Sequence, residues 1–225
     1  MEIKLDNFDL NRVVRFLPLK IKSIMEQEFW RGKIFIAGGF IRDLVAGDKV
    51  NDIDLFVNNK AEAELLLSVL QGDKKVISTE NAFTICERMP IQIIHRWTFQ
   101  KPEEVLLSFD FSVCSAAMYY SDNGWEGICH ERFYKDVASK RLIYLVPDRE
   151  EAPGGSMIRI LKFYRRGYNI PLNNLSKVVA RMMKDAEDCY KHDDVENSLK
   201  MYIDKALFEV DPLAIPMFDD SNKDD

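Results

Sequence analysis

The sequence has few cysteines and histidines and no long apolar run. No C-x-x-C pair occurs, and only three histidines accompany the cysteines, which are Cys86, Cys114, Cys129 and Cys189. This pattern argues against a structural zinc site and against a disulfide framework, so we expect reduced thiols in the core. No apolar run is long enough to cross a bilayer, and the N-terminus mixes both charges. We therefore expect no membrane span and no secretory signal, and predict a cytoplasmic protein.

The acidic charge is concentrated at the C-terminus. The chain has 225 residues, of which 47% are hydrophobic, and a net charge of −6. Residues 218–225 hold four aspartates and one lysine, so this segment carries −3 of that charge. We expect it to be a disordered acidic tail. The rest is only mildly acidic, which leaves nucleic acid open as a partner because local basic patches make phosphate contacts.

The hydrophobic pattern predicts an α/β head in residues 1–150 and a helical, neck-like region in residues 151–217. Predicted strands occupy residues 33–39, 51–57, 74–78, 82–87, 91–97, 109–120, 125–130 and 141–146. Predicted helices of the head occupy residues 9–29, with a break at Pro18, then 40–47, 61–72, 102–108 and 131–139. Three further helices are predicted over residues 156–168, 175–191 and 194–210.

Two aspartates stand one residue apart in an apolar segment that reads as a strand. Because side chains alternate faces along a strand, Asp52 and Asp54 are expected on the same side of it, close together. Such like charges repel unless a cation lies between them, so the pair is a natural seat for Mg²⁺. A solvated edge strand would carry the same pattern, and this alternative stays open for the aspartates alone.

A pair of glycines stands where a predicted strand passes into a helix. Gly38 and Gly39 allow a ligand to approach the backbone closely, and the N–H groups at the start of the helix favour a phosphate. Arg42 lies one turn further on, within reach of the same anion, and Asp43 is expected to fix the loop by accepting hydrogen bonds. The glycines taken alone also fit a simple tight turn.

These motifs resemble a known family when taken together. G-G-F-I-R-D followed by N-D-I-D-L-F resembles the signature of the DNA polymerase β-like nucleotidyltransferases, and most of all the head domain of CCA-adding tRNA nucleotidyltransferases and bacterial poly(A) polymerases. The resemblance implies a mixed sheet with flanking helices, and transfer of a nucleoside monophosphate from an NTP with release of pyrophosphate. It implies that Asp52 and Asp54 bind two metal ions, and that Gly38, Gly39 and Arg42 contact the triphosphate.

Two later segments extend the resemblance. Phe109-Asp110-Phe111-Ser112 resembles a family segment that contains an aspartate, so Asp110 is a candidate catalytic residue, either as a metal ligand or as an interdomain hydrogen-bond anchor. Residues 158–168 resemble a helix of the same family. On that helix Arg159, Lys162 and Arg166 share one face, which is suited to a triphosphate or a nucleic-acid backbone; a solvated basic face is the alternative.

The sequence also departs from the family at two places. The family's base-reading E-D-x-x-R motif is replaced by residues 152–156, A-P-G-G-S. The superfamily commonly has a third metal-binding carboxylate on a strand beside the two aspartates, but residues 91–97 offer only Gln92 there. His95 and Arg96 end the same strand and are candidates to line the acceptor site, although packing in the core or at the surface is the more common role for such a histidine.

The sequence thus predicts a Mg²⁺-dependent nucleotidyltransferase that uses an NTP. The form of the glycine motif favours an RNA or tRNA 3′ end as the acceptor, while a protein hydroxyl or a small molecule stays open. The two departures would also permit a catalytically silent relative that serves as a binding or regulatory module.

Overall fold

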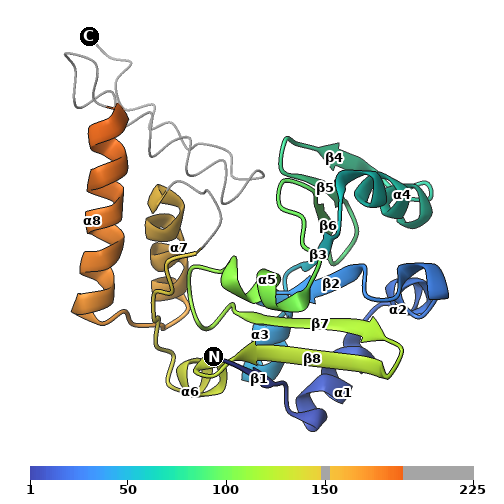
Figure 1. Ribbon diagram of the computed structural model, residues 1–225, viewed down its shortest axis with the longest axis horizontal. Coiled ribbons are helices and arrows are strands. Elements are labelled where there is room, and N and C mark those ends of the chain that lie inside the picture. Colours follow the sequence, from blue (N-terminus) through green and yellow to red (C-terminus); the bar gives the residue numbers. More distant parts are fainter. Residues whose placement is uncertain (148–152, 190–225) are drawn as a thin grey trace.

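The computed structural model describes residues 1–147 and 153–189 (Figure 1). The predicted helix over residues 194–210 and the acidic tail over residues 218–225 lie outside the described residues. In the described part no helix is both long enough and apolar enough to span a membrane.

One mixed sheet organises the head. Its strand order is β1-β8-β7-β2-β3-β6-β5-β4, and of the neighbouring pairs only β3 and β6 run parallel. The strands are β1 (Glu2–Lys4), β2 (Ile34–Ala37), β3 (Ile53–Val57), β4 (Val76–Ser78), β5 (Ala82–Ile85), β6 (Ile91–Ile94), β7 (Ala116–Ser121) and β8 (Gly124–His130). This is the mixed α/β architecture that the sequence predicted.

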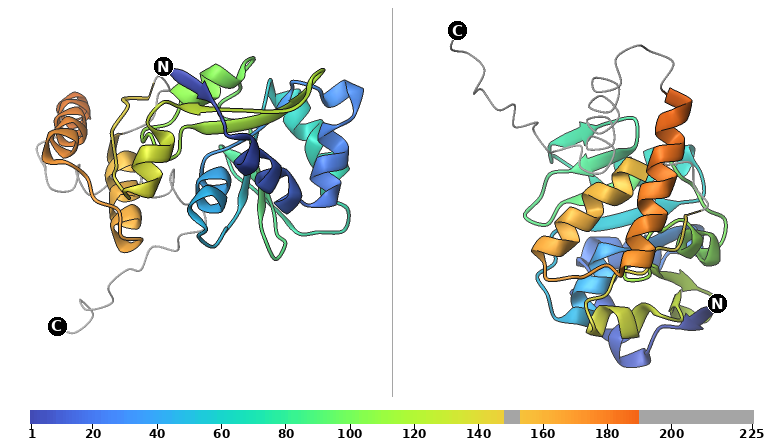
Figure 2. Two further views of the ribbon diagram at one scale, coloured as in Figure 1. Left: turned by 90° about the horizontal axis from the view of Figure 1, so that it is seen from below. Right: turned by 90° about the vertical axis from the view of Figure 1, so that its left-hand side faces the viewer.

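Helices pack against the sheet, and two of them lie beyond one of its ends. They are α1 (Asn7–Phe16), α2 (Leu19–Met25), α3 (Gly39–Ala46), α4 (Lys60–Leu70), α5 (Pro102–Leu107), α6 (Phe133–Ala138), α7 (Pro153–Arg165) and α8 (Leu172–Cys189), with a short 3₁₀ turn η1 (Glu28–Trp30). In the left view of Figure 2, α1 and α3 lie on one side of the sheet and α5 lies on the other. Helices α7 and α8 pack side by side at the end of the sheet opposite α2 and α4 (Figure 1).

The central strands form the core because both of their faces are covered. All four residues of β2 are buried, and β3 is buried at every position except Asp54, which is half-buried. Such continuous apolar strands are expected where helices or loops cover both sides of a sheet. Asp54 is therefore a single polar position within the most apolar part of the sheet.

Most of the predicted elements are confirmed, and Pro18 separates α1 from α2 as expected. The prediction of a strand over residues 109–120 was wrong for its first half, because β7 begins only at Ala116. The hydroxyl of Ser112 donates to Asp136, and that of Ser115 donates to the carbonyl of Leu106. Side-chain bonds of this kind hold a segment in a non-extended path, which hydrophobic alternation does not reveal.

The predicted strand over residues 141–146 was also wrong. Its residues make only isolated bridges, Phe111 with Tyr144 and Arg141 with Asn169. The segment connects the head to α7 instead of joining the sheet. The sequence missed β1, whose three residues are all exposed and therefore give no hydrophobic signal.

Two adjacent leucines of α4 provide a test of the core. Leu66 is 1% exposed, whereas Leu65 is 44% exposed. Leu66→Ala should lower the free energy of unfolding by about 2–5 kcal/mol, because it leaves a cavity against the sheet. Leu65→Ala should change it by less than about 1 kcal/mol. Urea unfolding of both variants checks this, and equal losses would contradict the assigned face of α4.

Candidate functional site

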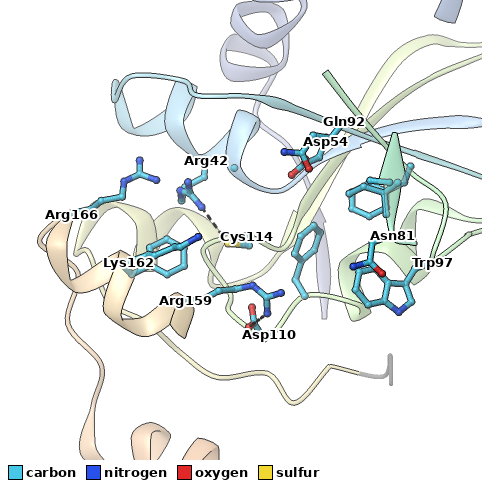
Figure 3. Close-up of a pocket in the computed structure, with 16 residues that line it drawn as sticks. Arg42, Asp54, Asn81, Gln92, Trp97, Asp110, Cys114, Arg159, Lys162 and Arg166 are labelled. Atoms are coloured by element: carbon cyan, nitrogen blue, oxygen red, sulfur yellow. Dashed lines mark hydrogen bonds and ion pairs between the residues drawn. The ribbon is translucent and has the colours of Figure 1, made fainter. Parts of the chain in front are cut away.

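A cavity of about 280 Å³ lies between one face of the sheet and α7 (Figure 3). Its walls come from α3, β3, β5, β6, the loop before β7, and α7. The lining residues are Gly39, Arg42, Asp54, Phe56, Asn81, Ala82, Gln92, Ile94, Trp97, Phe109, Asp110, Cys114, Arg159, Lys162, Phe163 and Arg166. The cavity thus gathers segments from both the predicted head and the predicted neck.

The glycine turn connects β2 to α3 at the rim of this cavity. Gly38 has φ 76° and ψ −127°, a conformation that L side chains rarely adopt, and α3 begins at Gly39. A Cβ on Gly38 would lie 3.2 Å from the Phe109 ring and 3.8 Å from Oδ2 of Asp54. The glycine therefore both permits the turn and leaves room beside the Asp54 carboxylate.

The two aspartates lie at the start of β3. Asp52 precedes the strand, and Asp54 is its second residue, paired in register with Ala37 of β2 and Gln92 of β6. Asp54 lines the cavity, and Nε2 of Gln92 donates to Oδ2 of Asp52 over 3.4 Å. Gln92 therefore stands directly beside the aspartates, where the sequence offered no third acid.

One face of α7 supplies the basic side of the cavity. Arg159 and Lys162 of α7 line it together with Arg166, the residue that directly follows the helix, so the three basic side chains meet as their spacing predicted (Figure 3). Nη1 of Arg159 lies 2.6 Å from Oδ2 of Asp110, whose side chain is buried. The Arg159 pair ties α7 to the loop before β7.

Asp43 connects two of the cavity's arginines. Its Oδ1 accepts from Nε of Arg42 and from Nη2 of Arg166, each over 2.7 Å, and its side chain is 3% exposed. Asp48 adds a longer contact of 3.5 Å to Arg166. Asp43 accepts hydrogen bonds, as expected, and through them it joins α3 to the end of α7.

Arg42 is buried between the glycine turn and α7. Its Nη1 donates to Sγ of Cys114 over 3.3 Å, and its guanidinium lies 4.9 Å from the centre of the Phe163 ring. Burial by itself would lower the pKa of Arg42, but Cys114 and Asp43 outweigh burial and raise it. The side chain therefore holds a positive charge at the bottom of the cavity.

Asp110 is placed by its ion pair. It is 1% exposed and bonded to Arg159, a geometry that fits the anchor alternative better than the metal-ligand alternative. Within residues 1–147 and 153–189, no three His, Cys, Asp or Glu side chains are grouped closely enough to hold a metal ion. Asp52 and Asp54 are therefore the two carboxylates to consider together.

Sequence reasoning did not assign the cavity residues Asn81, Trp97, Phe109 and Cys114 to a site. Asn81 lies between two predicted strands, Trp97 ends a predicted strand, and Phe109 and Cys114 belonged to the wrongly predicted strand. His95, considered for the acceptor site, instead stacks on Phe83 with ring centres 4.4 Å apart, and burial lowers its pKa. The pattern of a turn or strand gives no sign that these side chains meet across the fold.

The chain is similar to known proteins in sequence. A protein-family model described as "Gabija anti-defense 2 family protein" matches residues 14–140. A curated protein of Bacillus phage SPbetaL7, named "Gabija anti-defense 2", is 23% identical over 179 residues, which make up 78% of this chain and 43% of that protein. The chain thus spans less than half the length of this curated relative.

Solved structures show the same fold at low identity. The Thermotoga maritima CCA-adding enzyme complexed with tRNA has a TM-score of 0.56 at 19% identity, over 93% of this chain and 57% of the enzyme. A CCA-adding enzyme complexed with ATP has a TM-score of 0.58 at 18% identity, with the same coverage of 93% and 57%. The predicted resemblance to the nucleotidyltransferase head is confirmed at the level of the fold.

Two glycines with positive φ test the turn at the cavity rim. Gly38→Ala should lower the free energy of unfolding by up to about 3 kcal/mol, because the backbone conformation is strained and the new methyl group meets Phe109. Gly47→Ala should lower it by about 1 kcal/mol, because φ is 75° but nothing lies within 4 Å. Urea unfolding measures both. A loss for Gly38→Ala no larger than that for Gly47→Ala would show that the turn is less tightly packed.

Proposed function

The chain belongs to the Gabija anti-defense 2 family, and we propose that it transfers a nucleoside monophosphate from an NTP to an acceptor hydroxyl in a Mg²⁺-dependent reaction. The observation that carries this proposal is the single cavity that joins the glycine turn, Asp54 and the basic face of α7. Each feature alone has an ordinary structural explanation. Their convergence from three distant segments is what a triphosphate site requires.

The residues present fit a magnesium ion. Asp52 and Asp54 would provide the oxygen ligands, and Mg²⁺ is commonly bound through one or two carboxylates together with substrate phosphates and water. The space that Gly38 leaves beside Oδ2 of Asp54 suits a phosphate oxygen next to such an ion. When bound, the metal would neutralise phosphate charge and polarise the attacking hydroxyl. A second ion at the same carboxylates belongs to this proposal.

The protein's own groups would position the substrates and neutralise the charge of the triphosphate. Gly39 at the start of α3 lines the cavity and would offer its N–H to the triphosphate, which would be surrounded by the four basic residues that also line it: Arg42, Arg159, Lys162 and Arg166. In the reaction, the acceptor oxygen forms a bond to the α-phosphorus while the bond from that phosphorus to the bridging oxygen breaks. Pyrophosphate leaves and the hydroxyl proton passes to solvent. The basic side chains stabilise the charge that gathers on pyrophosphate.

The acceptor and the domain roles are part of the proposal. Residues 1–150 would act as the catalytic head and residues 151–217 as its neck. The form of the glycine motif favours an RNA 3′ end, and the structurally similar CCA-adding enzyme was determined with tRNA. A protein hydroxyl or a small molecule is the alternative acceptor.

Aspartate variants test the chemistry. Asp52→Asn and Asp54→Asn should each lower the rate of nucleotidyl transfer by at least about 100-fold, because they remove charge that holds the metal and substrate. The measurement follows label from NTPs into an RNA and protein mixture, together with pyrophosphate release. Asp122→Asn is the matched control, since that carboxylate lies on an exposed hairpin and pairs only at the surface with Arg31. Unchanged transfer in the Asp54 variant, with the fold intact by thermal melting, would refute the proposed site.

A silent binding module is the second candidate, favoured by one observation. Gln92 occupies the strand position beside Asp54 where a third carboxylate is expected. Such a protein would still be stabilised by an NTP with Mg²⁺, because a ligand selective for the native state raises its stability. Stabilisation by ATP and Mg²⁺ without any pyrophosphate release from the wild type would support this candidate over the enzyme.

The family name suggests the biological role. We propose that the activity counteracts the Gabija defence system. A Gabija-sensitive phage should form plaques at least about tenfold more efficiently on Gabija-carrying bacteria that express the wild-type chain than on the same bacteria expressing the Asp54→Asn variant. Equal protection of the phage by both proteins would assign the effect to binding instead of catalysis. The Asp122→Asn protein is again the control, and immunoblotting checks expression.

A further inference from the structure

We propose that the end of the cavity formed by β5, β6 and the residues after β6 binds an unpaired nucleobase of the acceptor strand, with Trp97 as its stacking surface. The inference rests on the proposed function and names the part of the acceptor that this chain recognises. It assigns recognition to side chains of the head, on the far side of Asp54 from the basic helix.

The in-line geometry of phosphoryl transfer determines the side from which the acceptor must approach. Attacking and leaving oxygens lie roughly in line in phosphoryl transfer. The triphosphate end is formed by α3 and the basic face of α7, and Asp54 lies between this end and β6. The acceptor hydroxyl must therefore approach from the β6 and β5 side. Figure 3 shows this division, with Arg42, Lys162 and Arg166 on one side of the cavity and Asn81 and Trp97 on the other.

The strand register places Asp54 and the side chains of β6 and β5 on one continuous surface. Asp54 pairs with Gln92, and Ile94 of the same strand pairs with Ala82 of β5. Directly paired residues share a face, so these side chains form one surface. Strands lie about 4.8 Å apart, and thus a group over β5 lies about 10 Å from Asp54. That span suits a nucleoside whose sugar hydroxyl points to Asp54 and whose base lies over β5.

Trp97 provides an aromatic surface at this end. It lines the cavity, and the guanidinium of Arg96 lies 4.8 Å from the centre of its ring. Nη1 of Arg96 also donates to Oδ1 of Asn81 over 3.2 Å, which links the indole to the turn before β5. Aromatic side chains and guanidinium planes are the groups on which unpaired bases stack.

Asn81 and Gln92 add polar groups of opposite kind. A guanidinium only donates, so the Asn81 atom that faces Arg96 is the oxygen, and the amide nitrogen bonds to no acceptor within residues 1–147 and 153–189. The Asn81 backbone is held by His95 and Arg96, whose N–H groups donate to its carbonyl over 3.0 and 3.1 Å. Gln92 uses Nε2 on Asp52, which directs its oxygen elsewhere. Donors and an acceptor on one surface are suited to the edge of a base.

The test measures binding without catalysis. A fluorescein-labelled single-stranded RNA, with either a normal or an abasic 3′-terminal nucleotide, is titrated with the full chain at one fixed salt concentration and without NTP, and anisotropy is recorded. Loss of the base should weaken binding by roughly 5- to 100-fold in the wild type, which is the usual effect of one stacked base. Trp97→Leu should weaken binding of the normal RNA by the same factor, and Trp97→Phe should restore most of it.

The two changes should not add. In Trp97→Leu, the abasic RNA should bind as well as the normal RNA, because their shared contact is already lost. Phe8→Leu is the matched control, since Phe8 is a 76% exposed aromatic residue of α1, outside the cavity. Equal binding of both RNAs by the wild type, or losses that add, would overturn the inference. So would transfer of label to protein only.

Failure of the proposed function gives a different result. A wild-type chain that shows the base-dependent binding but no pyrophosphate release would leave the subsite intact while refuting catalysis. A chain that transfers label to RNA without dependence on Trp97 would do the reverse.

Discussion

The structure depends on the charges that hold α7 against the head. Asp43 joins Arg42 of α3 to Arg166, and Asp110 joins the loop before β7 to Arg159. These carboxylates are almost fully buried, so removing either would take a close counter-charge away from arginines in a partly desolvated place. The same arginines line the cavity. Docking of the helix and the positive potential of the cavity are therefore one arrangement, and α7 could not move away without dismantling both.

The sheet contributes Asp54 to the candidate site, and this residue departs from the apolar pattern of the central strands. β3 is buried apart from Asp54, and the neighbouring Gly38 keeps the space in front of that carboxylate open. A polar group in such a strand needs a partner or an opening. Here the opening is the cavity, which the turn and the strand create together. The register with β6 then sets Gln92 beside the aspartates and carries the same face on to β5.

Much of this was predictable from the sequence, but not all of it. The glycine turn, Asp54 and the basic face of α7 follow from local spacing, and the regular elements follow from hydrophobic periodicity. The path of residues 109–115 did not follow, because side-chain bonds of Ser112 and Ser115 override the alternation. Neither the ion pair of Asp110 nor the approach of Asn81 and Trp97 to the cavity has a local signal. Such contacts between distant segments become visible only when the chain is folded.

The shared carboxylate of Asp43 also has an evolutionary consequence. A substitution of Asp43 would disturb both Arg42 and Arg166. We therefore expect these three positions to change together during evolution or to stay unchanged. Selection for a stable fold alone would then preserve the R-D half of the glycine motif, even in a lineage that had lost turnover. In this architecture the R-D half of the motif reflects how the helix docks, so only Asp52 and Asp54 can distinguish a lineage with the proposed activity from one without it.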